Sequence, residues 1–279
     1  MSLFFEIIKF IIYSGLIVLI SKYVLVSVLR KLAESLNLKP RIVGNIAGYA
    51  TSMPELLTIG ISSFNGLIGA SIYNVISSNI INLIQYVFAI ILNKNQKVLK
   101  NRALKIDIIM VAVTIAIPII IMLFKINVNI QLVPIFILLY SLFLVLNHNA
   151  HKFYLNEKEN DEEIKENSKE KGKVIKYIIY LFVTGILLFF IGNRLGDTLE
   201  NLCNIFNIPQ KIIGILLGFV TSIPELITFF EAQKHHKKNN DAILGVVEST
   251  NNLLTSNILN LFVIQSIGIV IYSLVWNFE

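Results

Sequence analysis

The sequence predicts an all-α polytopic membrane protein, built as an inverted-topology repeat of about eight transmembrane helices. First, 55% of its 279 residues are hydrophobic and only 15% are charged, whereas a soluble protein keeps about a quarter of its residues charged. Second, uncharged runs approach or exceed the ~20 residues that a membrane-spanning helix needs; they are Leu56–Asn93, Ile108–Phe124 and Ser249–Phe278. Third, two sequence motifs recur in the same order in the two halves of the chain.

The apolar runs predict the helices in order. They cover about 5–29, 42–63, 66–92, 106–124, 130–147, 177–193, 211–231 and 242–276. The first run is too long for a signal-peptide core and has no clear cleavage site, so we expect a retained helix. The last run is longer than one straight span needs, which leaves open a single tilted helix or a broken pair.

The chain divides into two halves joined by a charged linker. Residues 1–147 form the first half, with a repeated segment at 42–92; residues 148–176 are the linker; residues 177–279 form the second half, with its repeated segment at 211–276. Nearly all basic residues fall in the linker or in loops that would share its side of the membrane. The positive-inside rule therefore predicts a cytoplasmic linker and an N-terminus outside the cell membrane.

The repeat consists of two motifs. Gly48–Leu56 reads Gly-Tyr-Ala-Thr-Ser-Met-Pro-Glu-Leu, and Gly218–Leu226 reads Gly-Phe-Val-Thr-Ser-Ile-Pro-Glu-Leu. The helix after each carries Ser-Asn-Ile-Ile-Asn at 78–82 or Ser-Asn-Ile-Leu-Asn at 256–260. The two copies begin five spans apart, and an odd number of spans reverses the direction of the chain. This inverted repeat is typical of secondary transporters, which bind their substrates near the midplane between the repeats.

Oxygen-bearing side chains gather in these motifs. Pro54 and Pro224 each remove a helical hydrogen bond, and a carbonyl freed within the membrane needs a partner, which a cation can supply. The intramembrane carboxylates Glu55 and Glu225 indicate a functional site. Hard cations take carboxylate, hydroxyl, amide and backbone oxygens. The repeated helices contain no Cys or His, which argues against Zn²⁺ or Cu⁺.

Some polar residues of these helices have a simpler interpretation. Amide side chains can join transmembrane helices to one another, and this explains Asn74, Asn79, Asn252 and Asn257 in part. Glu248, on the same helix face as Asn252, is expected near the inner mouth, where its charge would attract cations. The alternative for Glu248 is a solvated side chain at the helix end.

At these residues the chain resembles the sodium/calcium exchanger family, whose two repeats carry Gly-x-x-Thr-Ser-x-Pro-Glu and then a Gly-Ser-Asn-like helix. Here the second motif appears as Ser-Ser-Asn and Thr-Ser-Asn. The resemblance implies ten helices, an outward N-terminus and a cytoplasmic central loop. It also implies ion ligands from both halves, with sodium-site backbone carbonyls at the two glycines: Gly48, Thr51, Ser52, Glu55, Ser78, Asn82, Gly218, Thr221, Ser222, Glu225, Ser256 and Asn260.

The chain departs from the family pattern in two places. Asn260 stands where prokaryotic exchangers of the family typically have an Asp, so a possible charge is absent. The sequence also ends 23 residues after Ser256, whereas the first repeat continues through two more helices. A shortened natural form, a gene fragment, and a protein completed by a homo-oligomer or another partner are the open alternatives.

The expected function is secondary active cation antiport, with Na⁺/Ca²⁺ exchange by alternating access as the leading hypothesis. Antiport of Ca²⁺ or another cation against H⁺ is the alternative. We expect no enzymatic activity, no cofactor besides the transported Na⁺ and Ca²⁺, a lipid bilayer as partner, and no nucleic acid. An intramembrane lipid-phosphate enzyme would need Arg or Lys beside the glutamates to hold phosphate. A passive channel would carry Ca²⁺ without an opposing Na⁺ gradient.

Overall fold

The computed structural model describes residues 3–36, 38–64, 66, 68–126, 128–154, 168–206, 212, 215, 218–219, 221–238 and 241–276. The first half contains α1 (Leu3–Leu19), the π-helical η1 (Ile20–Leu25), α2 (Val26–Ser35), α3 (Pro40–Thr51), α4 (Met53–Phe64), α5 (Ile68–Leu92), the short 3₁₀ helix η2 (Val98–Lys100), α6 (Arg102–Leu123) and α7 (Leu132–Tyr154). The second half contains α8 (Ser168–Ile205), α10 (Ile223–Lys238), α11 (Ala242–Ile258), the π-helical η3 (Leu259–Ile264) and α12 (Gln265–Trp276).

Six helical runs in the described part of the chain are long and apolar enough to cross a membrane, which confirms the all-α membrane class. They are Leu3–Ser35, Ser71–Leu92, Arg102–Leu123, Leu132–Lys152, Gly172–Thr198 and Ala242–Trp276. The last run is a single helix of 35 residues that continues through η3. The long apolar stretch at 242–276 is therefore one helix and not a broken pair.

The two motif helices are broken where single helices were predicted. The predicted helix 42–63 divides at Ser52 into α3 and α4, and Ser222 makes the corresponding turn before α10. Pro54 therefore lies in the first turn of a new helix, where its missing N–H has no intrahelical partner to lose. The predicted helices 42–63 and 211–231 placed both prolines in the middle of a helix. This was wrong, because each proline lies at the start of one.

Helices also extend beyond the predicted apolar runs. The run predicted at 177–193 lies within α8, which begins at Ser168 and ends at Ile205, and α7 continues to Tyr154. Charged residues such as Lys and Glu are good helix formers in water. Hydropathy therefore located the part of each helix that spans the membrane and missed its polar ends.

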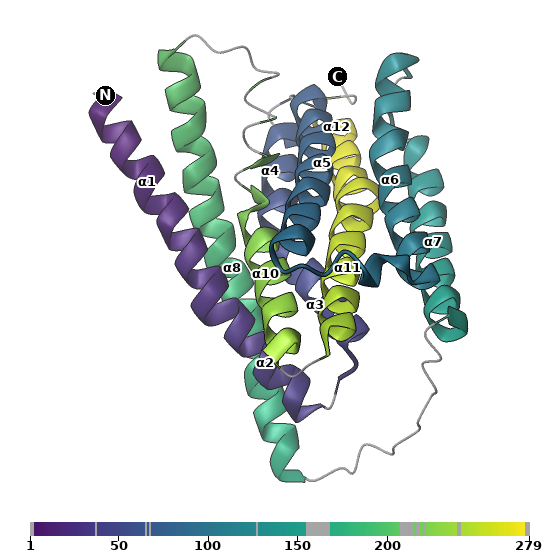
Figure 1. The fold of residues 1–279 in the computed structure, drawn as a ribbon. Coiled ribbons are helices and arrows are strands. Elements are labelled where there is room, and N and C mark those ends of the chain that lie inside the picture. Colours follow the sequence, from purple (N-terminus) through teal and green to yellow (C-terminus); the bar gives the residue numbers. More distant parts are fainter. Residues whose placement is uncertain are drawn as a thin grey trace.

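The helices form three groups (Figure 1). A long outer pair, α1 and α8, lies on one side, and the α6–α7 pair lies on the other, against α11 and η3. Between them, α3, α4, α5, α10, α11 and α12 form the core that carries the motifs. The ends of α2, α7 and α10 and the start of α8 all lie toward the lower end of Figure 1. This agrees with the predicted sorting of basic segments to one side.

The motif glycines allow helices of opposite halves to touch. A Cβ atom on Gly48 would lie 2.9 Å from the Asn252 carbonyl oxygen and 2.9 Å from the Thr255 Cβ, and one on Gly44 would collide with the Glu248 carbonyl oxygen. Helix α3 therefore lies directly on α11, as small residues permit in membranes. Gly218 repeats this contact in the other direction, because a Cβ there would collide with the hydroxyl of a serine on α5.

We expect Gly48→Ala to destabilise the protein by about 1–3 kcal/mol, because the added methyl group must push α3 away from α11. The change is measured as the loss of thermal stability of the purified protein in detergent. Gly15→Ala in α1 is the matched control, since its Cβ would meet nothing within 4 Å. Equal losses in both variants would contradict the close contact.

Candidate functional site

The predicted ligands converge at the two helix breaks. Glu55 and Glu225 lie in the first turns of α4 and α10, directly after the turns at Ser52 and Ser222. The Ser-Asn motifs lie on α5 and along α11 into η3. The ten predicted ligand side chains are all buried, none with more than 2% of its surface exposed: Thr51, Ser52, Glu55, Ser78, Asn82, Thr221, Ser222, Glu225, Ser256 and Asn260.

A chain of hydroxyl groups joins the two halves at this point. The Ser256 hydroxyl donates to Glu225 Oε1 at 3.0 Å, and the Ser52 and Ser256 Oγ atoms are 2.9 Å apart. Since a serine has only one hydroxyl proton, Ser52 must be the donor to Ser256. Asn82 Nδ2 also donates to Ser256 Oγ, at 3.4 Å. Serine and amide groups of the first half are thus connected to a carboxylate of the second.

The equivalent hydroxyl chain in the other half is not formed. Ser78, which corresponds to Ser256, donates to the Val75 carbonyl at 3.2 Å. The Ser222 hydroxyl and both carboxylate oxygens of Glu55 are buried without a hydrogen-bond partner among the described residues. The hydroxyl chain that ends at Glu225 is therefore formed, and the equivalent chain to Glu55 is not. The groups around each of these two glutamates are called a half-site below.

The two carboxylates interact with each other across the halves. Glu55 experiences the charge of Glu225, the Thr221 side chain faces Glu55, and Thr51 faces Glu225. Both threonine hydroxyls donate to backbone carbonyls of the preceding turn; for Thr221 the acceptor is Gly218, at 3.3 Å. The two threonines therefore connect the helix backbone before each break to the carboxyl group of the other half.

Several buried oxygen atoms at the site have no hydrogen-bond partner in the described part of the chain, and they are called the oxygen set below. Buried polar atoms are normally hydrogen-bonded, but within the described residues six buried oxygens here have no such partner: Glu55 Oε1 and Oε2, Glu225 Oε2, Asn82 Oδ1, Asn260 Oδ1 and Ser222 Oγ. Carboxylate, amide and hydroxyl oxygens are the ligands that hard cations take. The site therefore has the type of oxygen ligands that such a cation requires.

The carbonyls of Gly48 and Gly218 already accept hydrogen bonds. Ser52 N–H donates to Gly48 and Ser222 N–H donates to Gly218, both at 3.2 Å. Each carbonyl also has a threonine hydroxyl beside it, Thr51 at 3.4 Å from Gly48 and Thr221 at 3.3 Å from Gly218. A cation would compete with these donors for the two lone pairs of the carbonyl oxygen, and the role of the glycines as sodium-site carbonyls stays a prediction. The structure shows a separate role for these glycines in packing, because Gly48 lets α3 lie on α11 and Gly218 lies against α5.

Glu248 is placed differently from expectation. Its carboxylate is paired with the Arg30 guanidinium through two contacts of 2.8 Å and 2.7 Å, and it accepts a third, at 3.0 Å, from the His236 ring. The arginine balances its charge, so the arrangement does not support a role in attracting cations. His236 joins α10 to α11 through this contact.

A second buried polar cluster was missed. Asp107 on α6 contacts His151 Nε2 of α7 at 2.7 Å and accepts from Asn147 at 2.9 Å, and Asn147 also donates to Asn251 of α11 at 3.2 Å. The cluster attaches the α6–α7 pair to α11. Asp107 stands directly before the uncharged run Ile108–Phe124 and two residues after Lys105, so the sequence did not distinguish it from the charged residues of the preceding loop.

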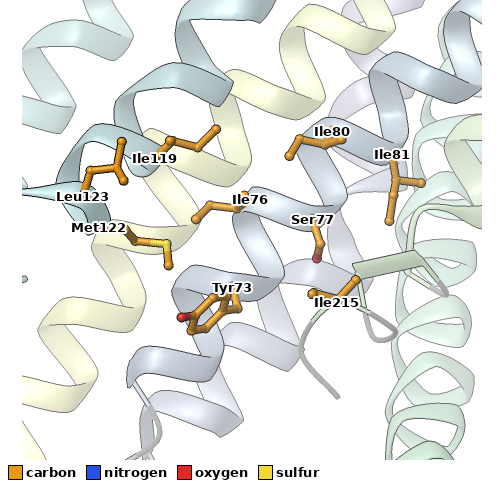
Figure 2. A pocket seen from close by; sticks show the side chains of 9 residues that line it. All are labelled: Tyr73, Ile76, Ser77, Ile80, Ile81, Ile119, Met122, Leu123 and Ile215. Atoms are coloured by element: carbon orange, nitrogen blue, oxygen red, sulfur yellow. The ribbon is translucent and has the colours of Figure 1, made fainter. Parts of the chain in front are cut away.

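An apolar pocket of about 390 Å³ lies beside the site and not in it. Figure 2 shows its lining on α5 and α6, where Ile76, Ile80 and Met122 surround it and Ser77 stands at one edge. No carboxylate is among its lining residues. The pocket therefore suits an apolar group and not a cation.

Comparison with known proteins places the chain in a family. The model of the sodium/calcium exchanger protein family matches residues 7–148 and 176–278. An uncharacterized membrane protein of Methanocaldococcus jannaschii is 27% identical over 215 residues, which cover 74% of this chain and 65% of that protein. The chain thus spans a little less than two thirds of the length of this relative.

Solved structures of the sodium-calcium exchanger NCX_Mj share the fold. The structure soaked with 10 mM Na⁺ and zero Ca²⁺ has a TM-score of 0.62 at 22% identity, covering 97% of this chain and 84% of that one. The structure soaked with 10 mM Na⁺ and 10 mM Sr²⁺ has a TM-score of 0.62 at 21% identity, covering 97% and 83%. Since the family model matches both halves and most of the sequence, the chain belongs to the sodium/calcium exchanger protein family.

Proposed function

We propose that this protein is a secondary antiporter that exchanges Na⁺ for Ca²⁺ by alternating access. The observation that carries the proposal is that Glu55 and Glu225, one from each half, lie close enough to interact, among buried oxygens that have no hydrogen-bond partner in the described part of the chain. The NCX_Mj exchanger, with the same fold, has been soaked with Na⁺, Ca²⁺ and Sr²⁺.

The composition of the site favours Ca²⁺ as one substrate. Ca²⁺ takes about six to eight oxygen ligands and tolerates irregular geometry. Two carboxylates balance its two charges, so that no net charge is left in the membrane interior. Na⁺ ions can use the same oxygens and compete for them, which makes the two cations alternative occupants of one site.

The same two carboxylates provide a reason for coupling. Without a cation, Glu55 and Glu225 are two buried like charges close together, and an uncompensated buried charge is strongly unfavourable. The unloaded site is therefore a poor candidate for crossing between its two orientations. A site loaded with Na⁺ or Ca²⁺ avoids this penalty, which favours exchange of one bound cation for the other. Protons on the two carboxyl groups would also remove the charge, and this is the basis of the cation/H⁺ alternative.

The difference between the half-sites supports alternating access. In the present arrangement the hydroxyl chain from Ser52 through Ser256 to Glu225 is formed. In the opposite orientation we expect the equivalent chain from Ser222 through Ser78 to Glu55 to form and the first chain to break. Inverted repeats make such an exchange of arrangements possible.

Glu55→Gln and Glu225→Gln should each abolish Na⁺-driven uptake of radiolabelled Ca²⁺ into proteoliposomes, because each removes a site charge but keeps the side-chain size. Glu231→Gln, on α10 but outside the oxygen set, is the control and should transport normally. Normal uptake by either site variant would contradict the assignment. Wild-type uptake driven by a proton gradient and not by Na⁺ would instead favour the cation/H⁺ alternative.

We propose that the charged linker and the basic loops on its side of the membrane face the cytoplasm. The N-terminus then lies on the outer side of the cell membrane. In a Cys203→Ser background, a cysteine replacing exposed Lys97 should react with an impermeant thiol reagent only after the cells are opened. A cysteine replacing exposed Lys125, on the α6–α7 connection, should react in intact cells. The reverse pattern would overturn this orientation.

A further inference from the structure

Four asparagine side chains meet where α5 crosses the α11–η3 helix. Asn79 corresponds to Asn257 and Asn82 to Asn260 in the repeat, and all four are fully buried. Asn79 Nδ2 donates to the backbone carbonyl of Asn257 at 3.2 Å, and Asn257 Nδ2 donates to the backbone carbonyl of Asn79 at 3.1 Å. The two halves are thus joined by a reciprocal pair of hydrogen bonds that follows the symmetry of the repeat.

The orientation of the Asn79 and Asn257 amides is determined by these bonds. A backbone carbonyl can only accept, so each side chain must direct its NH₂ group there. Each amide then presents its oxygen to an asparagine of the other half. Asn257 Oδ1 accepts from Asn82 Nδ2 at 3.1 Å, and Asn79 Oδ1 accepts from Asn260 Nδ2 at 3.4 Å.

These second contacts orient the two ligand asparagines in turn. If Asn82 or Asn260 flipped, its amide oxygen would face another amide oxygen, and two acceptors cannot form a hydrogen bond. The NH₂ groups of Asn82 and Asn260 therefore stay toward Asn257 and Asn79. Their Oδ1 atoms, both buried and without a partner in the described structure, are left for the cation site.

We propose that Asn79 and Asn257 are positioning residues that turn the amide oxygens of Asn260 and Asn82 toward the transported cation. This proposal rests on the proposed function. It also explains why an amide suits position 260: an ionised carboxylate there would place an oxygen against Asn79 Oδ1, whereas the amide donates to it. The fixed charge of the site then comes from the two glutamates alone.

A double-mutant cycle on Ca²⁺ affinity separates positioning from packing. If Asn79 acts on the cation through Asn260, Asn79→Ala should raise the dissociation constant for Ca²⁺ about tenfold, the usual scale for the partner of a ligand. In the Asn260→Ala background the same change should have less than about a twofold effect, because the oxygen that it orients is gone. Equal effects in the two backgrounds would show that Asn79 only packs α5 on α11 and would overturn the proposal.

The other half provides an independent cycle with Asn257→Ala and Asn82→Ala. It decides the question if a variant of the first cycle does not fold, and we expect the same non-additivity. Both cycles are read as equilibrium binding of radiolabelled Ca²⁺ to purified protein, not as transport. A wild-type protein that binds Ca²⁺ without exchanging it for Na⁺ would therefore contradict the proposed function and leave this test unaffected.

Discussion

The direct contact between α3 and α11 sets the distance between the halves, and the site depends on it. Gly44 and Gly48 have no side chain to separate the two backbones. Immediately beyond Gly48, the Ser52 hydroxyl reaches Ser256 at 2.9 Å. Hydrogen bonds between hydroxyl groups tolerate only a few tenths of an ångström. A larger residue in the α3–α11 contact would therefore separate the hydroxyl chain as well as loosen the packing.

Symmetry is kept at the centre of the site and lost around it. The reciprocal bonds of Asn79 and Asn257 are nearly identical in length. The hydroxyl chains differ, since Ser256 reaches its glutamate and Ser78 turns to a backbone carbonyl. A symmetric centre whose surroundings differ between the halves agrees with the proposal that one binding site serves both sides of the membrane in turn.

The repeated motifs allowed the fold class and the buried position of the predicted ligand residues to be predicted from the sequence. The helix break at Ser52 was missed because hydropathy runs unchanged through it. The pairing of Arg30 with Glu248 could not be predicted, since 218 positions separate the two residues and no local pattern links them. Asp107 follows the charged residues of a loop at the edge of an apolar run, and its partner His151 lies on another helix, so neither residue indicated the cluster.

The π-helical turn η3 reveals a difference in length between the two helices that carry the second motif. The second motif matches at a separation of 178 positions, as for Asn79 and Asn257, whereas the first motif matches at 170, as for Gly48 and Gly218. Beyond the turn, the buried Ala89 corresponds in its environment to the buried Gly268, 179 positions later, and not to Ile267, which is 40% exposed. The wider turn accommodates one extra residue, so the helix that contains it carries a single-residue insertion relative to α5 that leaves both the site and the helix face beyond it in register.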